Sequence, residues 1–225
     1  MAARRSDLGI RTASALVMLA VAGGALWLGG LVWTLFVALI ALGVFWEWRR
    51  LVVGFESRIV FRALWDIAGM AYIAIACVAL VVTRSSHHGL ELILAIVATV
   101  IAIDVGAYFS GRAIGGPKIA PKISPSKTWA GLAGGAAGAI LVLFLAEAQT
   151  GTVGTPGYIV VFGLAAVIIA QSGDFFESWM KRRAGVKDSS NLIPGHGGLF
   201  DRVDGLIAVL FVLALVFAPS VIDIL

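Results

Sequence analysis

Five acidic residues lie at or inside the ends of apolar stretches, where a carboxylate without a partner is costly. They are Asp104, Asp174, Glu177, Asp201 and Asp204. Asp174 and Glu177 are three residues apart, as are Asp201 and Asp204, so each pair would share one face of a helix. Carboxylates held side by side repel each other unless a cation lies between them. The spacing therefore predicts that these acids have cationic partners.

Two kinds of cation suit these acids, and the spacing leaves both open. A hard divalent ion is often held by one or two carboxylates, with water and phosphate oxygens completing its shell. The alternative is a set of structural ion pairs with the nearby Lys181, Arg182 and Arg202. The first interpretation predicts a site for phosphate chemistry, and the second predicts a packing role.

A phosphate-binding segment is predicted nearer the middle of the chain. Residues 124–128 are Ser-Pro-Ser-Lys-Thr and directly precede an apolar stretch. We expect this segment to open a helix, so that hydroxyls, free backbone N–H groups and the Lys127 ammonium converge at the positive helix end. The plainer interpretation is a helix cap formed by Ser124 or Ser126, with Pro125 setting the first turn. The two interpretations are compatible.

A single imidazole lies among glycines beside the last acidic pair. The segment Gly195-His196-Gly197-Gly198 has little side-chain bulk, so its backbone could approach a ligand closely or form a plain flexible turn. Two familiar motifs are absent. Residues 111–118 lack the Ser or Thr that follows the lysine of a nucleotide-binding P-loop, and no Cys and His residues are spaced for zinc.

The elements that must position these residues are apolar helices. Hydrophobic residues make up 60% of the 225, and the mean hydropathy is +0.99, more than a soluble domain could bury. Seven stretches approach the ~20 residues that a helix needs to cross a bilayer. They are Thr12–Leu28, Leu31–Trp48, Leu64–Thr83, Leu90–Tyr108, Thr128–Ala148, Gly157–Phe176 and Gly205–Ile222. We therefore expect an all-α polytopic membrane protein with about seven transmembrane helices.

We expect one membrane-embedded domain over residues 1–225. Residues 1–88 would hold the first three helices, and residues 89–225 would hold the helices and the two polar loops that carry the chemistry. Gly29-Gly30 separates the first two stretches, which favours an uncleaved helical hairpin over a signal peptide.

The distribution of basic residues predicts the orientation. If all seven stretches span, 16 of the 17 Lys and Arg residues fall on one side of the membrane, and Arg84 alone falls on the other. Positive residues collect in cytoplasmic loops, so we expect a cytoplasmic N-terminus and an outside C-terminus. We expect the basic residues behind the net charge of +4 to contact anionic lipid headgroups and substrate phosphates. No nucleic-acid partner is expected.

The second polar segment resembles the signature of the bacterial phosphatidate cytidylyltransferases, also called CDP-diglyceride synthetases. The resemblance extends over about 27 positions: Ser178-Trp-Met-Lys181-Arg182, Lys187-Asp188, Pro194-Gly-His196-Gly-Gly198 and Asp201-Arg202-Val-Asp204. The first segment is similar to that family as well, through Asp104, Ala107-Tyr108, Gly111-Arg112, Ser124-Pro125 and Lys127-Thr128-Trp129. With the helix layout, the resemblance covers roughly the C-terminal two-thirds of the chain.

The resemblance implies an enzyme of phospholipid biosynthesis in the bacterial inner (cytoplasmic) membrane. Such enzymes join CTP to phosphatidic acid, a membrane lipid, and release CDP-diacylglycerol and pyrophosphate. It implies that Asp174 and Asp201 hold a catalytic centre with Mg²⁺ as the principal ion, with or without a second cation. The other catalytic residues that it implies are Lys187, Asp188 and His196. The substrate-binding residues that it implies are Ser124, Lys127, Ser178, Lys181, Arg182, Arg202, Asp104 and Tyr108.

The resemblance also implies a homodimer with its active site on the cytoplasmic side. Family members are commonly longer, with extra spans in the N-terminal half. Two other functions suit parts of this pattern. A CTP-dependent lipid kinase of the same superfamily would transfer the γ-phosphate and release CDP. A cation-coupled transporter would carry its acids at mid-membrane on several helices, whereas here they gather at one edge beside lysines.

Overall fold

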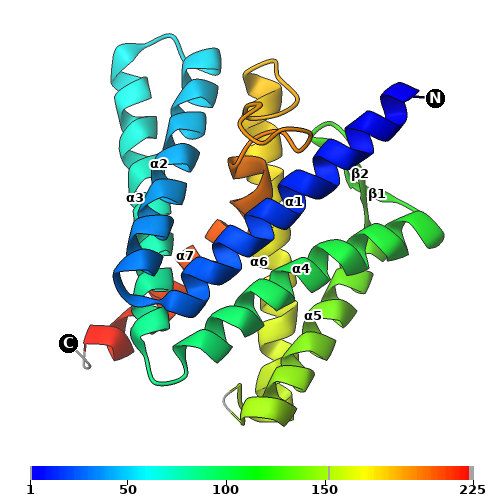
Figure 1. The fold of residues 1–225 in the computed structure, drawn as a ribbon. Helices are drawn as coiled ribbons and strands as arrows, with labels where there is room; N and C mark the ends of the chain where they lie inside the picture. Colours follow the sequence, from blue (N-terminus) through cyan, green and yellow to red (C-terminus); the bar gives the residue numbers. More distant parts are fainter. Residues whose placement is uncertain (1, 152, 223–225) are drawn as a thin grey trace.

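The computed structural model describes residues 2–151 and 153–222, with the side chains of residues 2–8, 10 and 218–222 left out of the description. This part of the chain forms seven helices and one two-stranded hairpin (Figure 1). The helices are α1 (Ala2–Leu28), α2 (Gly30–Phe55), α3 (Ile59–Ser85), α4 (Gly89–Ala113), α5 (Trp129–Thr150), α6 (Pro156–Arg183) and α7 (Phe200–Ile222). The strands are β1 (Lys118–Ala120) and β2 (Ser124–Thr128).

The predicted all-α membrane fold is confirmed. Among the described residues, six helices, α1 to α6, contain a stretch long and apolar enough to cross a membrane, and α7 is the seventh predicted helix. The chain is a multi-pass membrane protein. Several helices run past the predicted apolar stretches. Helix α2 continues beyond Trp48 to Phe55, and α6 continues beyond Phe176 to Arg183, so polar residues near these ends also lie on helices.

The turns alternate between two ends of the bundle. The α2–α3 turn, the β1–β2 hairpin and the loop after α6 lie toward one end, and the α1–α2, α3–α4 and α5–α6 turns lie toward the other (Figure 1). At the second end, Arg84 donates hydrogen bonds from its guanidinium to the carbonyl oxygens of Leu26 and Trp27. The side chains of Arg4 and Arg5, which the orientation argument also used, lie outside the described residues.

Helices α4 and α5 pack closely because glycines line their contact. A Cβ added at Gly106 would come within 2.4 Å of the Gly134 carbonyl oxygen, and one at Gly138 within 2.6 Å of the Ala102 carbonyl oxygen. Small residues allow this backbone approach between membrane helices. The pair therefore forms a rigid wall, and its α4 face carries Asp104.

An aromatic cluster holds the other half of the bundle together below the polar loop. Trp48 of α2 packs with Trp65 of α3, Phe176 of α6 and Phe200 of α7, with ring centroids 5.7 to 6.1 Å apart. The Trp48 indole N–H also donates to the Trp65 carbonyl oxygen at 3.0 Å. Such aromatic pairs stabilise beyond their buried area. The cluster fixes α6 and α7 beside α2, where the polar residues meet.

The hairpin before α5 corrects the prediction that residues 124–128 open a helix. Ser124–Thr128 is a strand paired antiparallel with Lys118–Ala120, and α5 begins only at Trp129. The cap is Thr128, whose Oγ1 accepts from the Gly131 N–H at 3.0 Å, and neither Ser124 nor Ser126. A residue before proline is pushed toward extended backbone, so Pro125 disfavours a helical Ser124.

Candidate active site

A cavity of about 410 Å³ with several charged residues in its lining opens between α4, the hairpin, α5 and α6. Its volume falls within the range of roughly 300–1,000 Å³ that small-molecule sites have. Four predicted site residues line it: Asp104, Tyr108, Lys127 and Asp174. Gln171 and two more basic residues, Arg112 and Lys118, also line it. The cavity thus joins the two polar segments that the sequence separates by about 50 residues.

Lys127 and Asp174 form an ion pair at the edge of this cavity. Lys127 comes from the end of β2, and its ammonium lies 4.5 Å from the centre of the Phe175 ring. Asp174 is on α6, with a side chain that is 33% exposed, and its Oδ1 accepts from Ser178 Oγ at 3.2 Å. A cation and an anion therefore both face a space large enough for a charged ligand.

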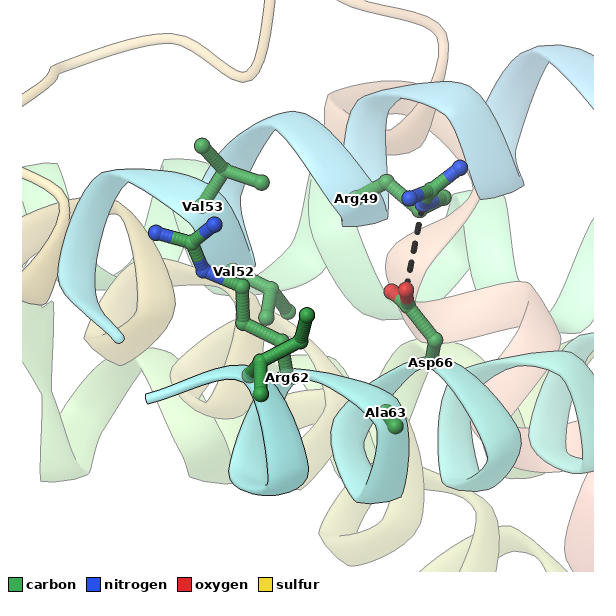
Figure 2. Close-up of a pocket in the computed structure, with 7 residues that line it drawn as sticks. Arg49, Val52, Val53, Arg62, Ala63 and Asp66 are labelled. Atoms are coloured by element: carbon green, nitrogen blue, oxygen red, sulfur yellow. Dashed lines mark hydrogen bonds and ion pairs between the residues drawn. The ribbon is translucent and has the colours of Figure 1, made fainter. Parts of the chain in front are cut away.

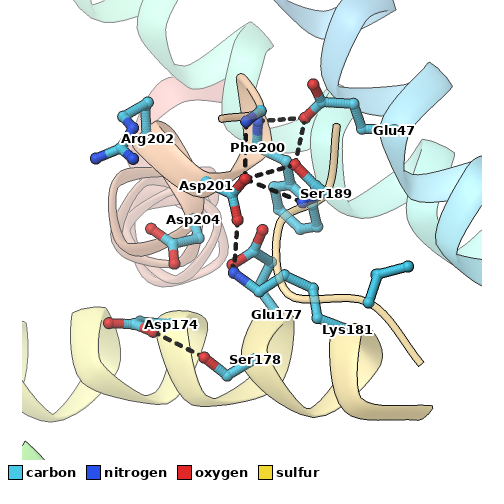
Figure 3. A network of polar contacts seen from close by, with 12 residues as sticks. Glu47, Asp174, Glu177, Ser178, Lys181, Ser189, Phe200, Asp201, Arg202 and Asp204 are labelled. Carbon is cyan, nitrogen blue, oxygen red and sulfur yellow. Dashed lines mark hydrogen bonds and ion pairs between the residues drawn. The ribbon is translucent and has the colours of Figure 1, made fainter. Parts of the chain in front are cut away.

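A second polar network lies between α6 and α7 (Figure 3). Lys181 Nζ donates to Glu177 Oε2 and to Asp201 Oδ1, each at 2.5 Å. Ion pairs, which were one of the two interpretations of these acids, are therefore present at Lys181. One lysine cannot neutralise two carboxylates, and Asp204 on the next turn of α7 adds a third near Glu177. Three carboxyl groups therefore gather around one lysine.

Asp201 accepts from two backbone donors in addition to its side-chain partners. Its Oδ2 accepts from the N–H groups of Ser189 at 3.0 Å and Gly198 at 2.8 Å. Asp201 lies before the apolar stretch of α7. Burial would raise its pKa, but the hydrogen bonds that it accepts, those of Lys181 and Gly198 among them, lower that pKa to about 2. Asp201 is thus an oriented anion.

Sequence reasoning missed one member of this network, Glu47. This carboxylate on α2 is fully buried and accepts hydrogen bonds from Ser189, Ser190 and the N–H groups of Leu199 and Phe200. A signal was present: an acid between Trp46 and Trp48 in an apolar stretch needs partners. Its partners are about 140 to 150 residues away in sequence, so the pattern could not name them.

The acids fit a sparsely held divalent ion. Among the described residues, no three His, Cys, Asp or Glu side chains form a group that could hold a metal alone. Magnesium needs fewer protein ligands, because one or two carboxylates suffice when substrate phosphates and water supply the rest. One oxygen of the buried Glu177, Oε1, has no hydrogen-bond partner. The arrangement can therefore accept one more cation.

Nine of the thirteen predicted site residues lie outside the lining of the cavity. Ser178, Lys181 and Asp201 belong to the contacts described above, and six others lie elsewhere. Ser124 is buried within the hairpin, and Arg182, Lys187 and Asp188 are exposed after or near the end of α6. The His196 Nδ1 lies 2.9 Å from Ser14 Oγ of α1. Arg202 donates from Nε to the His196 carbonyl oxygen at 3.1 Å. None of these six lines the cavity, and the partners of Asp174 in the described part of the chain are Lys127 and Ser178.

A second, smaller pocket of about 220 Å³ lies on the α2–α3 hairpin (Figure 2). Its walls are apolar apart from Arg49, Arg62 and Asp66. Arg49 Nε pairs with Asp66 Oδ2 at 3.1 Å, and Arg62 Nε donates to the Glu56 carbonyl oxygen. Because each of these charges already has a partner, this pocket is a poorer place for phosphate chemistry than the cavity at Asp174.

Known proteins of one family are similar to this chain. The model of the cytidylyltransferase family matches residues 54–219. A phosphatidate cytidylyltransferase of Brucella suis is 36% identical over 262 aligned residues, covering 95% of each chain. That of Rickettsia bellii is 33% identical over 211 residues, 91% of this chain and 88% of the relative. That of Haemophilus influenzae is 47% identical over 131 residues, 56% of this chain and 45% of the relative.

The lengths of these alignments bear on the expected N-terminal difference. The Brucella alignment is longer than this chain of 225 residues, so that relative has additional residues inside the aligned region. The Rickettsia alignment is shorter than the chain and still covers most of that relative. Some relatives therefore have additional residues within the aligned region, and others align over a length similar to that of this chain. The matched region includes both polar segments, the cavity and the Lys181–Asp201 pair, and the chain belongs to the cytidylyltransferase family.

Proposed function

We propose that this protein is a phosphatidate cytidylyltransferase, a membrane nucleotidyltransferase that converts CTP and phosphatidic acid into CDP-diacylglycerol and pyrophosphate. The family and the names of its relatives support the reaction. The observation that carries the proposal is the Lys127–Asp174 pair on a cavity of about 410 Å³, where the two family motifs meet at the end of an apolar bundle. A headgroup and a nucleotide can meet there while the acyl chains stay in lipid.

The reaction needs no nucleophile from the protein. A phosphate oxygen of phosphatidic acid attacks the α-phosphorus of CTP, a new P–O bond forms, and the bond from the α-phosphorus to the bridging oxygen breaks. Pyrophosphate leaves with the electron pair of that bond. The work of the protein is positioning and charge neutralisation, as in other phosphoryl transfers. Lys127, Arg112 and Lys118 of the cavity would bind the phosphates and balance their charge.

Asp174 and Asp201 would hold Mg²⁺, which when bound supplies screening between the two anionic substrates. Asp174 is accessible from the cavity, whereas Asp201 Oδ1 faces Lys181. Lys181 would therefore keep Asp201 and Glu177 in place and carry part of the charge. Ser178, which donates to Asp174, would orient its carboxylate. His196 and Arg202 would order the loop over this site through the backbone contact that joins them.

Product identification tests the proposal. Purified protein in detergent, incubated with labelled CTP, phosphatidic acid and Mg²⁺, should form CDP-diacylglycerol. Phosphorylated lipid together with free CDP would instead identify a CTP-dependent kinase. Omission of phosphatidic acid provides the control, because no labelled lipid should then form.

A pyrophosphate-exchange assay tests the one-step mechanism. Direct attack predicts that the enzyme cannot exchange labelled pyrophosphate into CTP unless lipid is present. A two-step route would pass through a cytidylylated residue, with Ser124, His196 or Lys187 as the candidate nucleophiles. Rapid exchange in lipid-free enzyme, or a trapped cytidylylated residue, would overturn the one-step mechanism and leave the overall reaction unchanged.

We propose that the polar loops face the cytoplasm and that the protein lies in the inner membrane. The proposal rests on the 16 of 17 basic residues that fall on one side and on the alternation of turns in Figure 1. A reporter fused after Leu225 should report the outside, and reporters inserted at residues 118–123 or 185–190 should report the cytoplasm. A cytoplasmic C-terminal reporter would contradict this orientation.

A further inference from the structure

Glu47 is a fully buried carboxylate on α2, outside the residues that the family model matches. It does not line the cavity, and the proposed reaction assigns it no role. A carboxylate buried in this way is stable only when donors satisfy both of its oxygens. The identity of these donors indicates what the residue does.

Each Glu47 oxygen accepts one hydrogen bond from a serine hydroxyl and one from a backbone N–H. Figure 3 shows Glu47 beside Ser189 and Phe200, the donors to Oε2. Oε1 accepts from Ser190 Oγ at 2.5 Å and from the Leu199 N–H at 2.9 Å. Oε2 accepts from Ser189 Oγ at 2.8 Å and from the Phe200 N–H at 2.6 Å. A hydroxyl can rotate to suit another partner, but a backbone N–H cannot. The side chain at position 47 must therefore have two terminal atoms that both accept hydrogen bonds.

Two of the four donors to Glu47 belong to the residues just before Asp201 in the chain. Leu199 and Phe200 directly precede it, and their N–H groups belong to the start of α7. Ser189 joins the two carboxylates, because its Oγ lies 2.8 Å from Glu47 Oε2 and 3.0 Å from Asp201 Oδ2. The Ser189 N–H also donates to Asp201 Oδ2.

Gly198 shows how closely the loop approaches this carboxylate. A Cβ at position 198 would come within 1.8 Å of Ser189 Oγ and 2.8 Å of Glu47 Oε2. Glycine is therefore required for this contact. The contact fixes the loop between α6 and α7 against α2, and Asp201 with it.

We propose that Glu47 is a positioning residue for the transfer reaction. By accepting from Ser189, Ser190 and the first N–H groups of α7, Glu47 holds Asp201 in the orientation that the bound cation and substrates require. The inference rests on the proposed function. It extends the site to a helix outside the matched region, so the N-terminal half contributes to catalysis as well as to anchoring.

The variant Glu47→Gln tests this role, because it keeps the size of the side chain and places an amide NH₂ against a fixed N–H. Replacing a group that orients a metal ligand typically lowers activity or metal affinity roughly 10–100-fold. We expect that fall in kcat, with the Mg²⁺ concentration for half-maximal rate raised by a similar factor. The KM values for CTP and phosphatidic acid should change little. Glu56→Gln, near the end of the same helix, is the matched control and should behave as wild type.

Thermal unfolding in detergent without substrates gives a second readout. Mg²⁺ should raise the unfolding temperature of the wild type, and Glu47→Gln should need roughly 10–100-fold more Mg²⁺ for the same rise. If Glu47→Gln does not fold, Ser190→Ala serves instead. It removes one donor and leaves the carboxylate, and we expect a several-fold loss in kcat at unchanged KM.

Two results would overturn the inference. One is a normal kcat in a folded Glu47→Gln, or in Ser190→Ala if it replaces that variant. The other is a loss of kcat with unchanged Mg²⁺ dependence in both readouts. A failure of the proposed function would be seen separately, because wild-type protein would then form no CDP-diacylglycerol.

Discussion

Replacing Asp174 with Asn is expected to remove nearly all cytidylyl transfer while the protein still folds and inserts. Asp174 lines the cavity, pairs with Lys127 and is one-third exposed, so the loss of its charge affects the site more than the fold. Loss of a group that stabilises charge in the transition state typically lowers the rate roughly 10²–10³-fold. The measurement is kcat for CDP-diacylglycerol formation at saturating Mg²⁺.

The same change at Asp201 should abolish activity and also destabilise the protein. The Asp201 side chain is only 7% exposed and accepts from Lys181 and two backbone N–H groups. An amide cannot accept at both atoms, and leaving a buried donor without a partner costs about 1–3 kcal/mol. We therefore expect a lower unfolding temperature for Asp201→Asn than for Asp174→Asn.

Asp66→Asn is the matched control for both variants. Asp66 pairs with Arg49 in the pocket on the α2–α3 hairpin, far from the motif residues in sequence and in a different cavity. It should retain wild-type kcat. Near-normal turnover of Asp174→Asn or Asp201→Asn at saturating Mg²⁺ would show that the assignment of metal ligands is wrong.

Replacing Lys127 with Met is expected to lower kcat/KM for CTP by roughly 10²–10³-fold. The ammonium is the cation nearest Asp174, and it lies against the Phe175 ring on the cavity wall. Met keeps the length of the side chain without its charge, so both the ion pair and the neutralisation of the triphosphate are lost. Steady-state kinetics over a range of CTP concentrations measure the effect.

Lys122→Met controls for a general loss of positive charge. Lys122 is exposed on the turn between β1 and β2, and its replacement should leave kcat/KM within about twofold, as surface substitutions usually do. A Lys127→Met enzyme with kcat/KM as high as that of Lys122→Met would contradict the role given to Lys127.

The helices could be predicted from the sequence because bilayer thickness sets a length that apolar runs must meet. The stretch predicted at Leu64–Thr83 lies inside α3, and that predicted at Gly157–Phe176 lies inside α6. The ends were less predictable. The last two turns of α6 carry Lys181 and its neighbours, and their polarity hides the fact that the helix continues.

The β1–β2 hairpin and the N-cap residue of α5 could not be predicted from hydropathy or from stretch length. Ser124-Pro-Ser-Lys-Thr contains three residue types suited to a helix start, and the choice of Thr128 depends on pairing with Lys118–Ala120. That pairing is a contact between segments and leaves no local signature. The effect of Pro125 on Ser124 was the one signal available.

The sequence named most of the charged residues that the structure brings together at the candidate site, but it could not predict which of them pair. The spacing of Asp174 with Glu177 and of Asp201 with Asp204 predicted cationic partners, and the structure joins Asp174 to Lys127 and Asp201 to Lys181. The sequence could not assign Lys127 to Asp174, because the partners come from β2 and α6. The partners of Glu47 were the hardest to predict, because its four donors all lie beyond residue 188.

The fate of the individual CTP phosphates tests the central claim most directly. Two parallel reactions with phosphatidic acid and Mg²⁺ would use CTP labelled at the α-phosphorus in one and at the γ-phosphorus in the other. A cytidylyltransferase places the α label in the lipid product and the γ label in pyrophosphate, in equal amounts. A γ label in the lipid, with the α label in free CDP, would contradict the account and identify a lipid kinase.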